Sequence, residues 1–303
     1  MYAVSPLRYP GAKWRLETFV NSILENNNLS LCNYAEPFAG GASLAISLLF
    51  RGFVGEIHLN DFDRSIFAFW NCVLNYTDEL LDLIETTPVT MESWYAQKDI
   101  QANKAFVSDI ELGFSTFFLN RANRSGILTA GVIGGKAQAG KWKIDARFNK
   151  DNLKNRILSI SKLKGRIHLY NQDALDFIKA CDSILPERSF VYLDPPYYVK
   201  GPELYLNAYT HEDHLTLARA VLSELSLPWM VSYDDVAEIK SLYSKVKSNE
   251  ESYLLPYSAS LERKGREIFF FSPKLNVCNE DLHVSIRSER ARKRNPSLLA
   301  RGC

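Results

Sequence analysis

The segment from Asp194 to Tyr198 (DPPYY) directly follows the apolar run Ser189–Leu193. Two successive prolines end a strand and fix φ, so the Asp194 carboxylate and the Pro195 carbonyl are held at its carboxyl end, where ligands bind in open α/β sheets. Two neighbouring acceptors suit an NH2 donor such as the amino group of adenine or cytosine, and Tyr197 offers a ring face for stacking a base. The alternative is a strand end with two surface tyrosines.

A glycine pair, Gly40-Gly41, lies between a predicted strand at Asn33–Glu36 and a predicted helix at 42–50. Glycines there let backbone N–H groups and the helix N-terminus approach a nucleotide-like ligand. The third glycine of the G-x-G-x-x-G pattern is missing, which argues against NAD. Asp61 follows Gly40 by 21 residues and ends a second predicted strand, a position that commonly binds ribose hydroxyls. Alone, each feature also fits a turn or a helix cap.

These segments require a sheet with alternating helices to position them. Further strands are predicted at 167–170, 190–193 and 229–232, with helices at 174–181, 211–225 and 236–243, and one long amphipathic helix at 64–84. The end is antiparallel, with paired strands near 253–255 and 267–271. The sequence therefore predicts an α/β protein.

Between the two β/α blocks, residues 88–150 read as an insertion, helical over 91–118 and then loop-like with five glycines. The segment Gly113 to Arg156 carries nine Lys/Arg against two Asp/Glu, and Ser285 to Cys303 carries six against one. Because phosphate contacts from Lys and Arg dominate nucleic-acid affinity, these segments favour a polyanion partner. The alternative is a solvated basic loop and a frayed tail.

Composition and motifs exclude several classes. No apolar run is long enough to cross a bilayer, and the start lacks the layout of a signal peptide, so no membrane association and a cytoplasmic location are expected. The five cysteines have no C-x-x-C spacing, and Thr210 to Asp213 reads as a helix capping box rather than part of a metal site. We expect no metal. The Pro-Cys nucleophile of cytosine-C5 methyltransferases is also absent.

Together, four motifs resemble the Dam-type (D12 class) DNA adenine-N6 methyltransferases, which use S-adenosylmethionine. The motifs are RYPGAK (8–13), EPFAGGA (36–42), Asn60-Asp61 and DPPY (194–197). The family order also matches: a cofactor motif, the glycine motif, a target-recognition insert and then DPPY. The resemblance covers residues 6–272.

The resemblance implies roles for individual residues. Tyr9 and Lys13 match positions beside the cofactor, Asp61 matches the ribose-binding position, and Asp194 would lie between the cofactor and the target amino group. Asp173 resembles an acidic position near the cofactor adenine and equally suits a helix N-cap. The full cofactor-binding set is Tyr9, Lys13, Glu36, Phe38, Gly40, Asp61, Asp173 and Asp194, and the catalytic set is Asp194, Pro195 and Tyr197.

The insert resembles the family less uniformly. Residues 117–121 (FFLNR) and Ser125-Gly126 resemble the family loop next to the target base. Arg124 stands where GATC-specific members have an aromatic residue, and their guanine-reading arginine has no match near 128–130, so GATC specificity is not expected. The predicted DNA-binding residues are Arg121, Arg124, Ser125, Lys136, Lys141 and Lys143.

The predicted fold is α/β, a Rossmann-like methyltransferase sheet of about seven strands with an inserted, mainly helical target-recognition domain. The catalytic domain spans 1–87 and 151–275, the insert 88–150, and a basic tail 276–303. The predicted function is methyl transfer from S-adenosylmethionine to N6 of a flipped adenine in double-stranded DNA, with a paired restriction enzyme left open. Alternatives are an RNA adenine-N6 enzyme, a DNA cytosine-N4 enzyme, and a catalytically dead nucleic-acid-binding module.

Overall fold

The computed structural model describes residues 5–9, 13–199, 209–244, 253–255 and 265–277. These residues form seven strands in one sheet, in the order β3-β2-β1-β4-β5-β7-β6. The strands are β1 (Asn33–Glu36), β2 (Glu56–Asn60), β3 (Ile167–Tyr170), β4 (Ser189–Leu193), β5 (Trp229–Asp234), β6 (Tyr253–Leu255) and β7 (Gly265–Phe271). The first five are parallel, whereas β7 is antiparallel to both β5 and β6. The predicted α/β sheet with an antiparallel end is confirmed.

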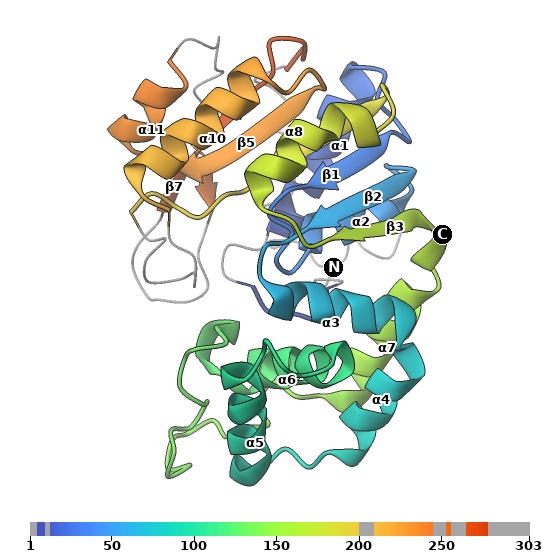
Figure 1. Cartoon of the computed structure of the whole chain (residues 1–303), viewed down its shortest axis with the longest axis vertical. Helices are drawn as coiled ribbons and strands as arrows, with labels where there is room; N and C mark the ends of the chain where they lie inside the picture. Colours follow the sequence, from blue (N-terminus) through green and yellow to red (C-terminus); the bar gives the residue numbers. More distant parts are fainter. Residues whose placement is uncertain (1–4, 10–12, 200–208, 245–252, 256–264, 278–303) are drawn as a thin grey trace, which may run out of the picture.

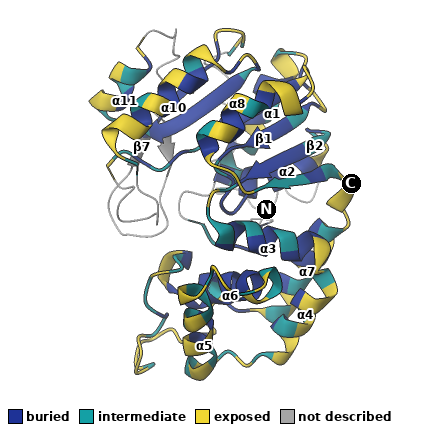
Figure 2. Ribbon diagram, viewed as in Figure 1, coloured by how far each residue is buried: buried dark blue, intermediate teal, exposed yellow. Residues whose placement is uncertain are grey.

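Helices cover both faces of this sheet (Figure 1). The helices are α1 (Glu17–Asn26), α2 (Ser43–Arg51), α3 (Arg64–Asn75), α4 (Thr77–Thr86), α5 (Met91–Ala102), α6 (Asp109–Ala122), α7 (Lys150–Ser161), α8 (Ala174–Ile184), α10 (His211–Ser223) and α11 (Ala237–Leu242). One core lies between the sheet, α1, α2 and α3, and the second between the sheet, α8, α10 and α11. Strands covered on both faces read as nearly continuous apolar runs, and all five residues of β4 are buried. Figure 2 shows these buried strands beneath helices that expose one side.

The predicted long helix at 64–84 is wrong, because the structure has two helices there. Tyr76 has φ −131° and ψ 42°, which ends α3 and lets α4 begin at Thr77 in a new direction. Asp78 and Glu79 in the first turn of α4 favour a helix start there, since acidic side chains interact well with a helix N-terminus. In Figure 1, α4, α5 and α6 lie below α3, on the side away from the sheet.

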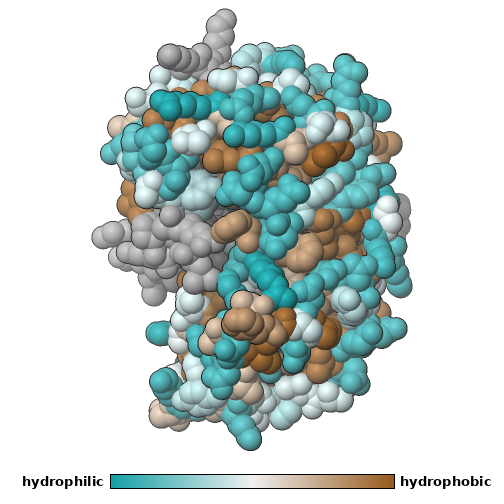
Figure 3. Space-filling model, viewed as in Figure 1, coloured by the Kyte–Doolittle hydropathy of each residue, from teal (hydrophilic) through white to brown (hydrophobic). Residues whose placement is uncertain are grey.

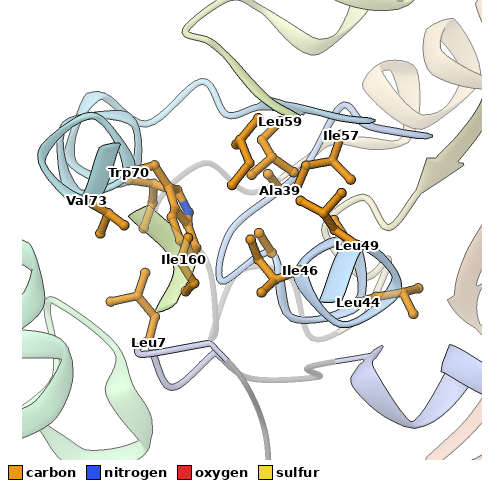
Figure 4. Packing of buried hydrophobic residues seen from close by; sticks show 14 of the residues in the cluster. Leu7, Ala39, Leu44, Ile46, Leu49, Ile57, Leu59, Trp70, Val73 and Ile160 are labelled. Carbon is orange, nitrogen blue, oxygen red and sulfur yellow. The ribbon is translucent and has the colours of Figure 1, made fainter. Parts of the chain in front are cut away.

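The helices below the sheet are joined to it through α3. Phe69 of α3 stacks on Phe117 of α6 with ring centroids 6.2 Å apart. Trp70 of α3 is buried in the same core as Leu7 and Ile160 (Figure 4), and its Nε1 donates to the Gly40 carbonyl at 2.9 Å. Because of these contacts, the glycine turn after β1 is fixed to the helical layer as well as to the sheet.

Asn60, at the end of β2, ties the carboxyl ends of three strands together. Its buried side chain donates to the carbonyls of Pro37 (3.0 Å) and Gln172 (3.1 Å) and accepts from the Gln172 N–H (3.0 Å). These bonds join the loops that follow β1, β2 and β3, and buried amides with all their partners satisfied hold a loop in one arrangement.

The surface seen in Figure 3 is mixed, with polar side chains over the outer helices and apolar ones at the junction between the sheet and the lower helices. Among the described residues, no helix has both the length and the apolar character needed to span a membrane.

Candidate active site

A cavity of about 580 Å3 lies at the carboxyl ends of the parallel strands, where the strand order reverses between β1 and β4. This switch point is the usual ligand site of open α/β sheets. Seven of the eight predicted cofactor residues line it, namely Tyr9, Lys13, Glu36, Phe38, Asp61, Asp173 and Asp194. Residues separated by up to 204 positions in the sequence, Tyr9 and Asp213, therefore meet in one cavity.

Gly40 is the exception, and its role is indirect. It adopts φ +47°, and a Cβ there would lie 2.7 Å from the Tyr9 ring. Gly41, which does line the cavity, would place a Cβ 2.9 Å from the Cβ of Tyr9. The glycine pair therefore makes room for Tyr9 against the turn. The Gly40 N–H also donates to Asp61 Oδ2 at 2.8 Å, so the turn orients Asp61, the residue predicted to bind the ribose.

Asp61 is held by backbone N–H groups on both carboxylate oxygens. Gly40 binds Oδ2, and the Asp63 N–H binds Oδ1 at 2.9 Å. Burial raises the pKa of Asp61 to about 7, although these two hydrogen bonds act in the opposite direction. The next residue, Phe62, lines the cavity with 60% of its surface exposed. Sequence reasoning missed Phe62, and the signal was an aromatic residue directly after a strand-terminal acid.

Glu36, the last residue of β1, is a buried acid. Its Oε1 accepts from the Tyr34 hydroxyl and from the Ala45 N–H, both at 3.1 Å. Burial raises the pKa of Glu36 to about 8, the hydrogen bond from Tyr34 lowers it, and the nearby Asp194 charge raises it further. With a pKa of about 8, this side chain holds a proton most of the time at neutral pH unless a cation lies beside it.

Asp194 has one oxygen anchored. Oδ1 accepts from the Ser232 hydroxyl at 2.7 Å and from the Lys13 ammonium at 2.9 Å. Among the described residues, no hydrogen bond reaches Oδ2. Burial raises the pKa of this carboxyl, Lys13 lowers it, and Glu267 raises it. A carboxylate anchored through one oxygen beside a cavity is well arranged to accept a bond from a ligand through the other.

Tyr197 lies deeper than expected for a stacking platform. Its side chain is 3% exposed and is absent from the cavity lining, where Pro196 stands instead. The Lys13 ammonium donates to the Tyr197 hydroxyl at 2.9 Å, and that hydroxyl donates to Glu267 Oε1. Pro195 is buried and also absent from the lining. Stacking of a base on Tyr197 and acceptance by the Pro195 carbonyl therefore stay predictions.

Asp173 is a helix N-cap, as one of its two alternatives predicted, and its role near the cofactor adenine stays a prediction. Its side chain caps α8 by accepting from the Leu175 N–H at 2.8 Å, and the residue also lines the cavity. The predicted capping box at Thr210 is confirmed, since Thr210 and Asp213 exchange hydrogen bonds at the start of α10.

The predicted DNA-binding residues divide into two groups. Arg124, Ser125, Lys136, Lys141 and Lys143 are exposed. Arg124 folds back over Gly131, where a Cβ would lie 2.9 Å from its Nη2. Arg121 differs from the expectation of a free surface contact. It is half-buried, with Nε donating to the Arg147 carbonyl at 2.7 Å and Nη1 to the Pro6 carbonyl at 3.4 Å.

Arg121 belongs to a group of arginines that we call the arginine junction: Arg8, Arg121, Arg147 and Arg156. Arg8 donates to the Asn123 carbonyl at 3.1 Å and Arg156 to the Ser5 carbonyl at 3.0 Å. Within the described ranges, no carboxylate forms an ion pair with any of the four. Burial and the other three guanidinium groups lower the pKa of Arg121 to about 9. The junction thus joins the N-terminal segment to α6 and α7 through backbone carbonyls.

Asn120 lies in the segment 117–121, which resembles the family loop, but it was not predicted as a site residue. Its amide accepts from the Arg8 N–H and donates to the Arg8 carbonyl, both at 2.7 Å, and also donates to the Gly126 carbonyl at 2.9 Å. Gly126 has φ +78°, and a Cβ there would lie 2.3 Å from the Arg8 carbonyl oxygen. Asn120 lines the cavity, so the lower helices supply part of its wall.

A second polar cluster has the composition of a metal site. Potential ligand atoms of Glu56, His58 and His168 lie within 4.8 Å of one another. The two imidazole rings are stacked 4.4 Å apart at 16°, so their in-plane lone pairs run parallel and do not converge on one ion. Both ring nitrogens of His58 already contact Tyr170 and Asn33, each at 3.0 Å. The cluster is explained by these hydrogen bonds across the sheet edge.

Comparison with known proteins places these features among the methyltransferases. The model of the D12 class N6 adenine-specific DNA methyltransferase family matches residues 9–255. The Type II methyltransferase M.MjaIII of Methanocaldococcus jannaschii is 23% identical over 220 residues, which cover 68% of this chain and 73% of that protein.

Two solved structures overlap more loosely. The rRNA methyltransferase aviRa from Streptomyces viridochromogenes has 14% identity and a TM-score of 0.40, with 88% of each chain covered. The putative methyltransferase yhhF from Escherichia coli has 9% identity and a TM-score of 0.33, covering 88% of this chain and 90% of its own. At these scores the overlaps carry no argument about the substrate.

Proposed function

The chain belongs to the D12 class of N6 adenine-specific DNA methyltransferases, and we propose that its methyl donor is S-adenosylmethionine, held in the cavity beside Asp194, and that its acceptor is an adenine flipped out of double-stranded DNA. The enzyme is thus a DNA adenine-N6 methyltransferase that acts with a methyl-donor cofactor. Asp194 carries the proposal: it lines the cavity, and the Ser232 hydroxyl and the Lys13 ammonium both bind its Oδ1.

The cavity chemistry fits the proposed donor. Its lining holds six acids and one lysine, together with apolar side chains. The acids are Glu36, Asp61, Asp63, Asp173, Asp194 and Asp213, and the apolar residues include Phe38, Phe62, Ile66 and Leu175. S-adenosylmethionine supplies a methyl group on a cationic sulfonium and also carries an ammonium, a ribose and an adenine. Acidic side chains suit the cations and the ribose hydroxyls, whereas the apolar residues suit the adenine.

Individual acids would then have separate tasks. Asp61, fixed by two backbone N–H groups, keeps lone pairs available for the ribose hydroxyls. Glu36, protonated in the empty cavity, would ionise when a cation binds beside it. The binding free energy of the donor would therefore include proton release from Glu36.

In the reaction itself, Asp194 and the Pro195 carbonyl would accept the two N–H bonds of the target amino group. Accepting both bonds draws the nitrogen lone pair out of conjugation with the ring and aligns it for attack. The nitrogen gains positive charge in the transition state, and the Asp194 carboxylate stabilises that charge. Flipping the base costs a few kcal/mol, and stacking on Tyr197, worth about 1–3 kcal/mol, would offset this cost once the ring is uncovered.

DNA recognition is assigned in this proposal to residues 88–150, an insert between two parts of the catalytic domain, 1–87 and 151–275. The support is the exposed basic group Arg124, Lys136, Lys141 and Lys143 on the loop beside the cavity wall. Phosphate contacts from the lysines would provide affinity and Arg124 would contact a base edge. The tail beyond residue 277 lies outside the described residues, and a paired restriction enzyme is part of the proposal only by analogy with Type II systems.

The test is direct. The purified protein is incubated with S-adenosylmethionine and plasmid DNA that lacks methylation, and the nucleosides are identified by mass spectrometry. We expect N6-methyladenine in duplex DNA and none in an RNA transcript of the same sequence. N4-methylcytosine, or methylation of RNA alone, would contradict the proposal. Cofactor binding without any turnover would instead favour the nucleic-acid-binding module.

A further inference from the structure

Glu267 is a buried acid that no sequence motif indicated, and it lies beyond the matched family range of 9–255. It stands on β7, on the same face as Phe269 and Phe271, which fill the core at the alternate positions. Its side chain is 1% exposed. Glu267 Oε1 lies 3.3 Å from the Lys13 ammonium and accepts a hydrogen bond from the Tyr197 hydroxyl.

Through Lys13, Glu267 is one step from the catalytic carboxylate. The lysine has three N–H donors, and three acceptors surround it: Asp194 Oδ1 at 2.9 Å, the Tyr197 hydroxyl at 2.9 Å and Glu267 Oε1 at 3.3 Å. One cation is therefore shared between the buried carboxylate of Glu267 and the partly exposed carboxylate of Asp194. If Asp194 had Lys13 to itself, the lysine would neutralise its charge more completely and weaken it as a hydrogen-bond acceptor.

Stability alone does not account for an acid at this position. Replacing a buried ion pair by well-packed apolar residues is often neutral or stabilising, and the neighbouring core positions of β7 are phenylalanines. A buried acid that shares the lysine of the catalytic carboxylate therefore indicates a functional constraint.

We propose that Glu267 is a positioning residue for methyl transfer: it holds Lys13 and Tyr197 in place and withdraws part of the lysine charge from Asp194, so that Asp194 stays a strong acceptor for the target amino group. This inference rests on the proposed function of Asp194. Glu267 does not line the cavity, so its effect on Asp194 passes through Lys13 and Tyr197.

The charged and titratable groups that face Asp194 come from several elements. They are Lys13, Glu267, Tyr197, Tyr192, Tyr233, Tyr34 and Glu36. Among these, the Glu267 charge raises the pKa of Asp194 and the Lys13 charge lowers it. Removing the Glu267 charge should therefore lower the pKa of Asp194, and the acid limb of the rate profile should move to lower pH.

The experiment compares wild type and Glu267→Gln in single-turnover methyl transfer between pH 5 and 9, with the dissociation constant of S-adenosylmethionine measured separately. We expect the plateau rate to fall at least about tenfold, the acid limb to move to lower pH, and the cofactor affinity to change less than about threefold. The control is Tyr243→Phe. This variant removes the hydroxyl of a buried ring that stacks on Phe270, a residue of β7 like Glu267, and it should keep the wild-type rate and pH profile.

Two outcomes overturn the inference: a Glu267→Gln plateau rate within twofold of wild type, or a slower rate with an unmoved acid limb, which indicates a merely structural role. If Glu267→Gln does not fold, Glu267→Asp tests the inference instead, because its shorter side chain keeps the negative charge but places it farther from the Lys13 ammonium. A folded Glu267→Asp variant should lose at least about threefold in rate, and a wild-type rate would overturn the inference. A wild-type protein without methyl transfer would contradict the proposed function instead.

Discussion

The cavity and the arginine junction carry opposite charges in a chain whose net charge is only +1. The cavity gathers acids, two of which have a pKa raised by burial to about 7 and about 8, and its lysine is surrounded by acceptors. The junction gathers four arginines that donate to, or lie beside, backbone carbonyls, with no carboxylate paired to them among the described residues.

The opposite charges of the two regions suit them to ligands of opposite charge. A cavity whose acids are partly protonated when empty is prepared for a cationic ligand, because the ligand supplies the charge that lets them ionise. Arginines remain charged at neutral pH, and guanidinium groups close together without acids favour an anion nearby. The two regions meet at Arg8 and Tyr9, adjacent residues that belong to the junction and the cavity respectively.

The largest expected effect separates Asp194, the proposed catalytic carboxylate, from the other acids. Asp194→Ala should abolish methyl transfer, with a loss of at least about 10²–10³-fold, because the carboxylate acts on charge that develops in the transition state. The fold should survive, as measured by circular dichroism and thermal unfolding. Glu56→Gln, an acid on the sheet outside the cavity, is the matched control and should keep the wild-type rate. Retention of activity within about tenfold by Asp194→Ala would remove this role.

The next largest expected effect tests whether Asp61 binds the cofactor while Asp194 acts in methyl transfer. Asp61→Ala should weaken S-adenosylmethionine binding about 10–100-fold, because hydrogen bonds to a charged acceptor are worth about 1.5–3 kcal/mol, and should leave DNA affinity unchanged. Titration calorimetry with each ligand measures both. The exposed Asp151→Asn variant on α7 is the control. An unchanged cofactor affinity would end the ribose assignment.

A smaller effect separates the arginine junction from Arg124, the exposed arginine proposed to contact a base. Arg121→Met should lower the free energy of unfolding by about 1–3 kcal/mol, because two backbone carbonyls lose a charged donor, and should leave the methylated sequence motif unchanged. Arg124→Ala should leave stability unchanged and relax specificity at one position by about 1–3 kcal/mol.

Sequencing of modified DNA and denaturant titration check both variants. A motif altered by Arg121→Met and unaltered by Arg124→Ala would reverse the assignment. Lys136→Ala is the control for phosphate contacts: it should weaken binding to all sequences alike and lower the salt dependence by about one counterion.

The sequence predicted the site residues that leave a local pattern and missed those whose partners are distant in the chain. The DPPY segment, the glycine pair and Asp61 were found because strand ends, prolines and glycines leave local patterns, and the strands around them were confirmed to within about two residues. Glu267 left none, since it is the first residue of the strand predicted at 267–271, and its partners Lys13 and Tyr197 are distant in sequence. Arg121 read as a basic surface residue because its carbonyl partners, Pro6 and Arg147, are distant in sequence.

The smallest effect concerns the protonation of the cavity. Glu36 and Asp61 have pKa values in the folded, empty protein of about 8 and about 7, above their ordinary values near 4, so their contribution to stability is full at low pH and is lost as pH rises through 7 and 8. Burial lowers the pKa of His58 and of His214 to about 4, so the contribution of these two histidines acts below about pH 6.5, outside the range in which Glu36 and Asp61 ionise. The prediction concerns the range from pH 6.5 to 8.

Across that range the unfolding free energy of the empty enzyme should fall by up to about 1.4 kcal/mol per pH unit for each ionising group. Glu36→Gln should flatten this decline. Because a cation stabilises the ionised acids, S-adenosylmethionine should bind more tightly at pH 8 than at pH 6.5 and release up to about one proton from Glu36, which calorimetry in buffers of different ionisation enthalpy measures directly. If proton release is the same in wild type and Glu36→Gln, the titrating group lies elsewhere and the cavity is not held protonated for a cationic ligand.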